Sequence, residues 1–299
     1  MQKPMISIIA SAIRPENWPG LYENIGENDI EYELVFVGPN EPTFSLPDNF
    51  KYIKSNVKPA QCVEIAARHA SGTHLLWTAD DHLFTDTRSL DKLWELYSSF
   101  DHDNIIVSTA LDAPEGWNRF GQYGGESPKL ALCGLMSMRL WRDIGGVDRR
   151  FIAVNWDHDV CMRVIEQGGE IVLSDVFMDV DIVLPDRPDS RGTLLYDEVR
   201  SYDSALLKSL WSSENNKDFS RTSPLEPLSN EKILERSQQP QGRWRHRSSL
   251  INNLTTAVTG YRLRQWRSAT AGRAYRFALR NTPGPVSRLL RRLWADRKR

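Results

Sequence analysis

The chain has 299 residues, of which 40% are hydrophobic and 26% are charged, and its formal net charge is −1. This composition is that of a globular protein with a real core, and the longest apolar runs, at 5–10 and 130–136, are too short to cross a bilayer. Three widely spaced cysteines fit neither a disulfide framework nor a zinc site, and the start of the chain lacks a signal-peptide pattern, so we expect a reducing, cytoplasmic setting.

The small net charge conceals two segments of opposite charge. Residues 240–299 contain 14 Arg and one Lys against a single acid, whereas residues 1–239 carry 23 basic and 38 acidic side chains. Around the boundary, over 212–242, the composition shifts to Ser, Asn, Pro and Gln with few apolar residues. We therefore predict an acidic domain over 1–211, a linker over 212–242 and an Arg-rich tail over 243–299.

Short apolar runs alternate with helical patterns along the acidic domain. Strands are predicted at 5–10, 32–37, 51–54, 74–77, 105–109 and 170–173. Helices are predicted, from apolar residues at helical spacing, at 59–70, 90–97 and 160–165. This alternation favours an α/β fold with a mostly parallel sheet and helices on both of its faces. Ligands of such sheets bind beyond the carboxyl ends of the strands, so the residues that follow each strand are the candidates for a site.

Two adjacent acids follow the predicted strand 74–77. Asp80 and Asp81, with His82 next to them, would stand at the carboxyl end of that strand. Two carboxylates side by side form a hard-oxygen site for Mg²⁺ or Mn²⁺, and such an ion neutralises a diphosphate leaving group. The same residues also fit a solvated turn that caps the next helix.

A second group of residues joins two glycines to the start of a helix. Gly145 and Gly146 come shortly before Asp148, and Asp157 stands just ahead of the helix predicted at 160–165. A carboxylate that faces a cleft from the start of a helix is placed to act as a general base. In the alternative, Asp157 is a helix N-cap and the glycine pair is a tight turn.

Together, and in this order, these segments resemble the family 2 glycosyltransferases of the GT-A fold, bacterial-type enzymes of surface-glycan and polysaccharide biosynthesis. The resemblance spans about residues 5–182. Residues 56–72 resemble the stretch that leads from the third strand into a helix, and 78–81 take the place of the Asp-x-Asp motif. Residues 139–151 resemble the acceptor-side loop, and 156–163 resemble the Glu-Asp motif with its helix. The resemblance implies a GT-A-type, Rossmann-like sheet.

The resemblance also implies an inverting transferase that moves a sugar from a nucleoside-diphosphate sugar, a UDP-sugar by default, to a hydroxyl of a glycan or a lipid-linked glycan. Asp80 and Asp81 would hold Mn²⁺ or Mg²⁺ against the donor diphosphate, and Asp157 would deprotonate the acceptor hydroxyl. The resemblance also implies a set of donor-binding residues, each of which comes after one of the first four predicted strands. They are Ser11, Arg14, Gly38, Lys58, Gln61, Arg68 and Asp80. For the three of these between 58 and 68, the alternative is a place on a helix surface.

Three positions depart from the family pattern. Thr78 stands where the family has the first acid of its Asp-x-Asp motif, and Trp156 stands where it has the Glu before the base. The acid that the family has after its second strand, where it contacts the nucleotide base, has no clear match at 37–40. A GT-A-like module that binds without turnover is therefore one alternative function. The other is a sugar-nucleotide nucleotidyltransferase, which also combines an α/β sheet with paired Asp and Mg²⁺, although no Gly-rich loop with Arg or Lys follows the first strand.

The Arg-rich tail contains the pattern of an amphipathic helix. Over 286–294, Val, Leu and Trp fall on one face at helical spacing and three Arg fall on the other. Such a helix fits a membrane surface with anionic lipid, so we expect a protein held peripherally at the inner face of the cell membrane. In the alternative, this helix packs on the protein's own acidic domain. We expect no nucleic-acid partner, because no nucleic-acid module accompanies the Arg residues.

Overall fold

The computed structural model describes residues 4–113, 116–118, 129–180, 194–213 and 219–229. The chain divides into two compact units, of which the first holds residues 1–111 and 119–241. Of the second unit, the structure describes only residues 112–113 and 116–118. The core and the candidate site lie in the first unit.

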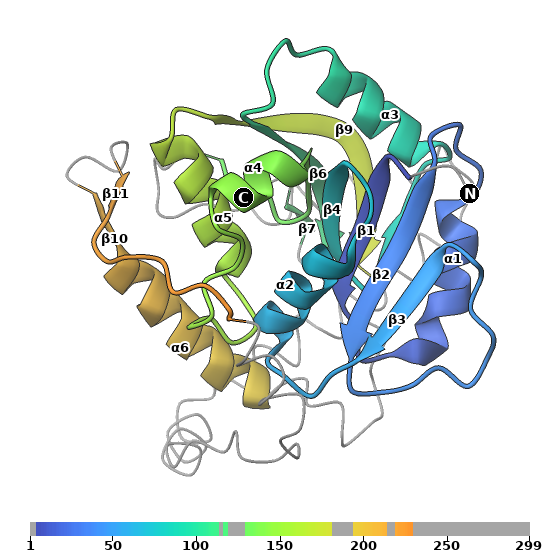
Figure 1. Ribbon diagram of the computed structural model, residues 1–299, viewed down its shortest axis with the longest axis horizontal. Coiled ribbons are helices and arrows are strands. Elements are labelled where there is room, and N and C mark those ends of the chain that lie inside the picture. The colour runs from blue at the N-terminus through green and yellow to red at the C-terminus, as the bar shows by residue number, and fades with distance from the viewer. Residues whose placement is uncertain (1–3, 114–115, 119–128, 181–193, 214–218, 230–299) are drawn as a thin grey trace. The chain divides into compact units, whose positions relative to one another are not determined.

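Four parallel strands form one half of the main sheet (Figure 1). In spatial order they are β3 (Phe50–Lys54), β2 (Tyr32–Gly38), β1 (Ile6–Ser11) and β4 (His74–Ala79). The strands β1, β2 and β4 are almost wholly buried, as expected of parallel strands that are covered on both faces. Because β1 pairs in parallel with both β2 and β4, the carboxyl ends of these three strands lie side by side.

The other half of the sheet contains antiparallel pairings. The strand β8 (Gly134–Ser137) pairs antiparallel with β4 and with β6 (Ile105–Ala113). At the far edge, β9 (Glu170–Val180) pairs antiparallel with β5 (His82–Phe84), and β7 (Gly116–Asn118) pairs with β6. The six predicted strands are all present, whereas β5, β7 and β8 were not predicted.

Helices cover both faces of the sheet (Figure 1). They are, in chain order, the short 3-10 helix η1 (Pro15–Asn17), α1 (Trp18–Ile25), α2 (Pro59–His69), α3 (Ser89–Ser98), α4 (Met138–Asp143), α5 (Trp156–Glu166) and α6 (Leu194–Leu210). Buried residues of α1 and α3 form one core cluster with one face of the strands, and those of α2, α4, α5 and α6 form a second cluster with the opposite face. The α/β fold, with helical layers on both faces of the sheet, is confirmed, and the parallel strands make up the half of the sheet from β3 to β4.

Part of the predicted linker packs on the domain. Residues 219–229, here termed the strap, lie within the segment 212–242. The strap begins with β11 (Phe219–Arg221), which pairs antiparallel with β10 (Trp211–Ser213), and its Leu228 side chain is buried. The low hydrophobicity of this segment predicted a loose connection, but its charged residues are held by the buried ion pairs described below.

The Arg-rich tail, residues 243–299, lies outside the described residues, and so does the amphipathic pattern at 286–294. The domain boundaries 1–211, 212–242 and 243–299 therefore stay predictions. In the part of the chain that the structure describes, no helix is both long and apolar enough to cross a bilayer.

Candidate functional site

The candidate site lies at the carboxyl ends of β1, β2 and β4. Ser11, the last residue of β1, stands opposite Val37 of β2 and Ala79 of β4. Asp80 and Asp81 follow β4 directly, and the loop after β1 carries Arg14. The residues that leave these neighbouring strands therefore meet at one edge of the sheet, as the α/β topology predicts.

The carboxylate of Asp80 fastens the loop after β1 to the end of β4. Its Oδ2 accepts hydrogen bonds from the backbone N–H groups of Ile13, at 2.7 Å, and of Arg14, at 2.6 Å. Its Oδ1 accepts a hydrogen bond from the Arg14 guanidinium. Burial raises the pKa of Asp80, against the charge of Arg14, which lowers it. All three of these partners are N–H donors, and such donors favour the ionised form of a carboxylate.

Arg14 bridges the two acids. The same nitrogen that contacts Asp80, Nη1, lies 3.3 Å from Oδ2 of Asp81. The Arg14 side chain is 22% exposed and that of Asp80 only 2%, so Arg14 is the more accessible member of this ion pair. Within the described part of the chain, Nε of Arg14 is buried without a hydrogen-bond acceptor. One guanidinium against two carboxylates leaves this trio with a net negative charge.

His82 lies against the side of the acid pair that faces the core. Its Nδ1 is 3.3 Å from Oγ1 of Thr78 and 3.2 Å from Sγ of Cys133, and its Nε2 is 3.9 Å from Oδ1 of Asp81. Burial lowers the pKa of His82, which favours the neutral ring. Thr78, in the place of the first acid of the family motif, therefore contacts an imidazole and adds no third carboxylate.

Asp157 lies in the first turn of α5, which begins at Trp156. The N-cap position belongs to Asn155, with a φ of 61°, so the alternative in which Asp157 caps the helix is wrong. The Asp157 side chain is half-buried, and burial raises its pKa, although the neighbouring His158 lowers it. A raised pKa suits a carboxylate that takes a proton from a hydroxyl.

The start of α5 lies against β4. Trp156, which begins α5, and Trp77 of β4 have ring centroids 6.1 Å apart. Asp157 follows Trp156 directly, and Asp80 and Asp81 follow the strand that contains Trp77. The thiol of Cys133 lies at the same strand end, 3.2 Å from Nδ1 of His82, and burial raises its pKa to about 12. The fold therefore brings together the segments that carry Asp81 and Asp157, although they are far apart in the sequence.

Asp203 of α6 holds the loop that leads into α5. Its buried carboxylate accepts three backbone hydrogen bonds, from Ile152 at 2.9 Å, from Ala153 at 2.8 Å and from Val154 at 2.9 Å. Three donors on one carboxylate fix the backbone just ahead of Asp157. Sequence reasoning missed Asp203, and its only signal is an acid on the core-facing side of a helical pattern.

Three predicted donor-binding residues contact other parts of the fold. Lys58 stands at the N-cap position of α2. Gln61 is fully buried, and its Nε2 donates to the backbone O of Arg149 at 2.9 Å. Arg68, in the last turn of α2, pairs with Glu64 at 2.8 Å and donates to a backbone carbonyl of the strap. These contacts do not bring Gln61 or Arg68 to the acid pair. The role of all three residues in donor binding stays a prediction.

Gly38 ends β2 where the loop after β1 comes close. A Cβ on Gly38 would lie 1.6 Å from the backbone O of Ala12. Any side chain would therefore push β2 away from the loop that carries Arg14. Gly38 and Ser11 line the strand ends beside the acid pair, as predicted, although a contact with a nucleotide is untested.

The glycine pair forms a tight turn. Gly145 and Gly146 have φ values of 84° and 68°, in the left-handed region that favours glycine. A Cβ on Gly146 would lie 2.2 Å from Oε2 of Glu64, and the same oxygen accepts a hydrogen bond from Val147 N at 3.1 Å. The turn is thus fastened to α2, which confirms the structural alternative for these two residues.

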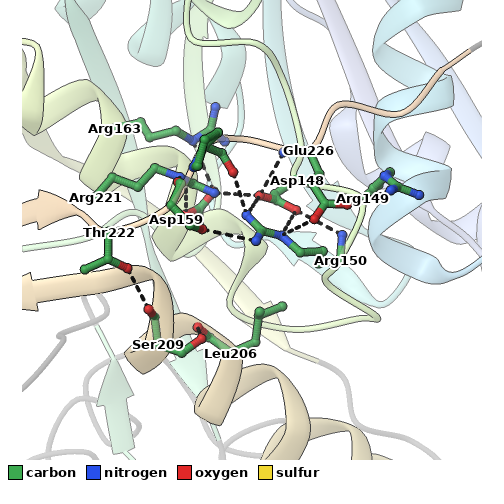
Figure 2. Close-up of polar contacts among 12 residues, drawn as sticks. Asp148, Arg149, Arg150, Asp159, Arg163, Leu206, Ser209, Arg221, Thr222 and Glu226 are labelled. Carbon is green, nitrogen blue, oxygen red and sulfur yellow. Dashed lines mark hydrogen bonds and ion pairs between the residues drawn. The ribbon is translucent and has the colours of Figure 1, made fainter.

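A buried ion network ties the strap to α5 and to the turn that follows the glycine pair. Figure 2 shows Arg221 of the strap between Asp148 and Asp159, with which it pairs. Arg150 pairs with Asp148 at 2.7 Å, and Arg163 pairs with Asp159 at 3.1 Å. Both acids are fully buried, so the arginines compensate their charges, and Trp211 Nε1 and the backbone N–H of Glu226 donate further hydrogen bonds to Asp159 and Asp148 respectively. Sequence reasoning missed Arg221, because nothing in its polar neighbourhood predicts burial.

The Asp80–Asp81 pair is the part of the site that suits a divalent cation. Among the described residues, no group of three or more His, Cys, Asp or Glu is arranged to hold a metal ion. Proteins hold Mg²⁺ with as few as one or two carboxylates when substrate phosphates complete the ligand set, and Mn²⁺ prefers the same oxygen ligands. Two adjacent carboxylates at a strand end therefore fit a cation that arrives with a diphosphate.

No family model and no curated protein matches the chain. Among solved structures it is similar to S. aureus TarS 1–349, with 14% identity over 58% of this chain and 60% of that one and a TM-score of 0.46. The complex of TarS 1–349 with UDP is 13% identical over 59% of this chain and 60% of the TarS chain, with a TM-score of 0.45. The mannosyltransferase PcManGT from Pyrobaculum calidifontis, in complex with GDP-Man and Mn²⁺, is 14% identical over 97% of this chain and 79% of the PcManGT chain, with a TM-score of 0.49. The chain thus spans 60% of the length of these two TarS structures.

Proposed function

We propose that this chain is a glycosyltransferase that moves a sugar from a nucleoside-diphosphate sugar to an acceptor hydroxyl, with inversion at the anomeric carbon. One observation carries the proposal. The paired acids Asp80 and Asp81, bridged by Arg14, stand at the carboxyl edge of the parallel strands, and Asp157 lies in the first turn of the helix whose first residue, Trp156, packs on Trp77 of the strand before them. A site for a diphosphate and a separate proton acceptor are the two functions that this transfer needs.

On the donor side, Asp80 and Asp81 would hold Mn²⁺ or Mg²⁺ together with the diphosphate. A divalent ion bound there neutralises the charge of the leaving nucleoside diphosphate. The loop after β1 is fastened to Asp80 through two backbone N–H groups, so the residues that border the diphosphate are set before the donor binds. Ser11 and Gly38, at the neighbouring strand ends, border the space proposed for the nucleotide.

On the acceptor side, Asp157 takes the proton of the attacking hydroxyl. The acceptor oxygen forms a bond to the anomeric carbon while the bond from that carbon to the diphosphate oxygen breaks, and the proton passes to the carboxylate. Because Asp157 acts as a base and forms no bond to the sugar, one displacement occurs and the configuration inverts. Such base assistance contributes about 10²–10⁴-fold in rate.

The finer parts of the proposal come from the family resemblance and from the tail. A UDP-sugar is the default donor, and the acceptor is a hydroxyl of a glycan or a lipid-linked glycan. The excess of 14 Arg and one Lys over a single acid in residues 240–299 supports a peripheral place at an anionic membrane surface, where lipid-linked acceptors are found.

The proposed function is tested by calorimetry of the purified full chain against a panel of nucleoside diphosphates and sugar nucleotides, with and without Mn²⁺. We expect one nucleotide to bind in a metal-dependent way, to lose binding in Asp80→Asn and to keep it in Asp86→Asn. Asp86 is a matched control because it is an exposed acid that pairs only loosely with Lys92, at 3.5 Å.

Binding of no nucleotide under any condition would contradict the proposal. Binding without transfer to any acceptor would favour the non-catalytic module, and release of diphosphate from a nucleoside triphosphate and a sugar phosphate would favour the nucleotidyltransferase.

A further inference from the structure

Arg14 holds the oxygen that a divalent cation would need. Oδ2 of Asp80 is taken by two backbone N–H groups, at 2.6 Å and 2.7 Å, whereas Oδ1 is held by the Arg14 side chain. That oxygen contacts Nη1 of Arg14, and the same nitrogen lies 3.3 Å from Oδ2 of Asp81. A cation that uses both acids must therefore take Oδ1 of Asp80 from Arg14.

We infer that Arg14 and the divalent cation compete for Asp80, and that the displaced Arg14 guanidinium pairs with the diphosphate that arrives with the cation. This inference rests on the proposed function and assigns Arg14 a role within it. Arg14 is then a donor-binding residue whose partner changes, from the acid pair to the phosphate oxygens.

The local structure allows the side chain to move without the loop. The backbone N–H of Arg14 is bonded to Asp80, and Pro15 begins η1 directly after it, so the backbone is held on both sides. The Arg14 side chain is partly exposed, and within the described residues its buried Nε has no acceptor to lose. A change of side-chain rotamer is therefore enough to turn the guanidinium away from Asp80.

The charges favour an exchange over simple loss of the ion pair. The trio of Asp80, Asp81 and Arg14 has a net negative charge, which repels a diphosphate. A divalent cation on the two acids neutralises them, and the released guanidinium matches phosphate oxygens with two parallel N–H donors. The cation and the nucleotide should therefore each strengthen the binding of the other.

The test measures the affinity of the full chain for Mn²⁺ by calorimetry, first alone and then with saturating UDP or GDP. The variants are Arg14→Ala and Arg14→Gln, and the matched control is Arg88→Ala, an exposed arginine that pairs with Asp29 and Asp91 away from the site. Without nucleotide, we expect both Arg14 variants to bind Mn²⁺ about tenfold more tightly than the wild type, because a charged competitor is gone. The strengthening of Mn²⁺ binding by nucleotide should be lost in both variants and kept in Arg88→Ala.

An Mn²⁺ affinity without nucleotide that is unchanged or weaker in the Arg14 variants would overturn the inference, and so would the absence of Mn²⁺ binding in every protein. This arm contains no nucleotide, so it is independent of the proposed function. If no nucleotide of the panel binds to any of the proteins while the Arg14 variants bind Mn²⁺ more tightly, the competition holds and the proposed function fails. Thermal melting reports whether each variant is folded. If Arg14→Ala does not fold, the outcome is decided by Arg14→Gln, which keeps a hydrogen-bond donor for Asp80.

Discussion

The half-buried Asp157 illustrates how one residue can weaken the fold and serve the reaction. Burial raises its pKa, so the carboxyl ionises more readily in the unfolded chain than in the folded one. Between the unfolded pKa and the raised folded pKa, the folded state binds more protons, and the free energy of unfolding therefore decreases as the pH rises. The same shift makes the ionised side chain a stronger proton acceptor.

Asp157→Asn is accordingly expected to separate stability from activity. We expect kcat to fall by about 10²–10⁴-fold with little change in donor affinity, because the base acts only in the transition state. The melting temperature of Asp157→Asn at neutral pH should equal or exceed that of the wild type. Between acidic and neutral pH, the melting temperature of the variant should decrease less than that of the wild type. Turnover assays and melting curves across that pH range test both effects. Asp143→Asn, at an exposed acid, is the control, and full turnover by Asp157→Asn would remove Asp157 from the mechanism.

The strap shows at the scale of elements why a polar segment can belong to a core. Its Arg221 is 9% exposed and pairs with two fully buried acids, Asp148 and Asp159. Each acid keeps a second arginine, from its own loop or helix, so the network is shared among three segments of the chain. Its position beside α5 makes the strap part of the support of the helix that begins at Trp156.

Removing the strap's arginine should therefore unfold the domain more easily. Arg221→Ala removes one charged donor from each of the buried acids Asp148 and Asp159, and the loss of a hydrogen bond to a charged group costs about 1.5–3 kcal/mol. Denaturant unfolding of the full chain measures the change in the free energy of unfolding. The control is Arg139→Ala, which removes an exposed ion pair with Asp103 and should cost below about 1 kcal/mol. Equal losses in the two variants would show that the strap contributes no more than a surface contact.

For the whole molecule, the charge distribution leads to a prediction about location. Residues 1–239 have a net charge of −15 and residues 240–299 one of +14, so the two segments would respond oppositely to an anionic surface. The tail is expected to bind vesicles that contain anionic lipid, and the acidic segment is expected not to.

Flotation of the full chain with vesicles tests this expectation. The protein should float with anionic vesicles, remain unbound with zwitterionic ones and dissociate at high salt. Replacing Arg288, Arg291 and Arg292 by Glu should weaken binding by about 100-fold or more, since each basic residue near the surface contributes about 1 kcal/mol. A full chain that stays at the bottom with anionic vesicles would exclude this role of the tail. A lower melting temperature of the triple variant, without any vesicle binding, would instead support packing of the tail on the acidic domain.

Several elements could be predicted from the sequence because their signals are local. The strands β1, β2 and β4 are runs of apolar residues, and the acid pair follows one of them directly. The strand β8 could not be predicted in this way. Only glycine fits at position 134, because a Cβ there would lie 2.5 Å from Trp77 and 2.6 Å from Ile106. Both of these residues belong to other strands. Such a requirement appears only when the strands are assembled.

By itself, the sequence determined the α/β class, the order of the main strands and helices, and the positions of Asp80, Asp81 and Asp157 along the chain, because hydrophobic periodicity and adjacency in sequence are local properties. Only the tertiary structure decided that Arg14 bridges the acid pair, that Asp203 holds the loop before α5 and that the strap is held to Asp148 and Asp159 through Arg221. These are contacts between residues distant in the chain. Their partners are chosen by how the elements pack, and no local pattern records that choice.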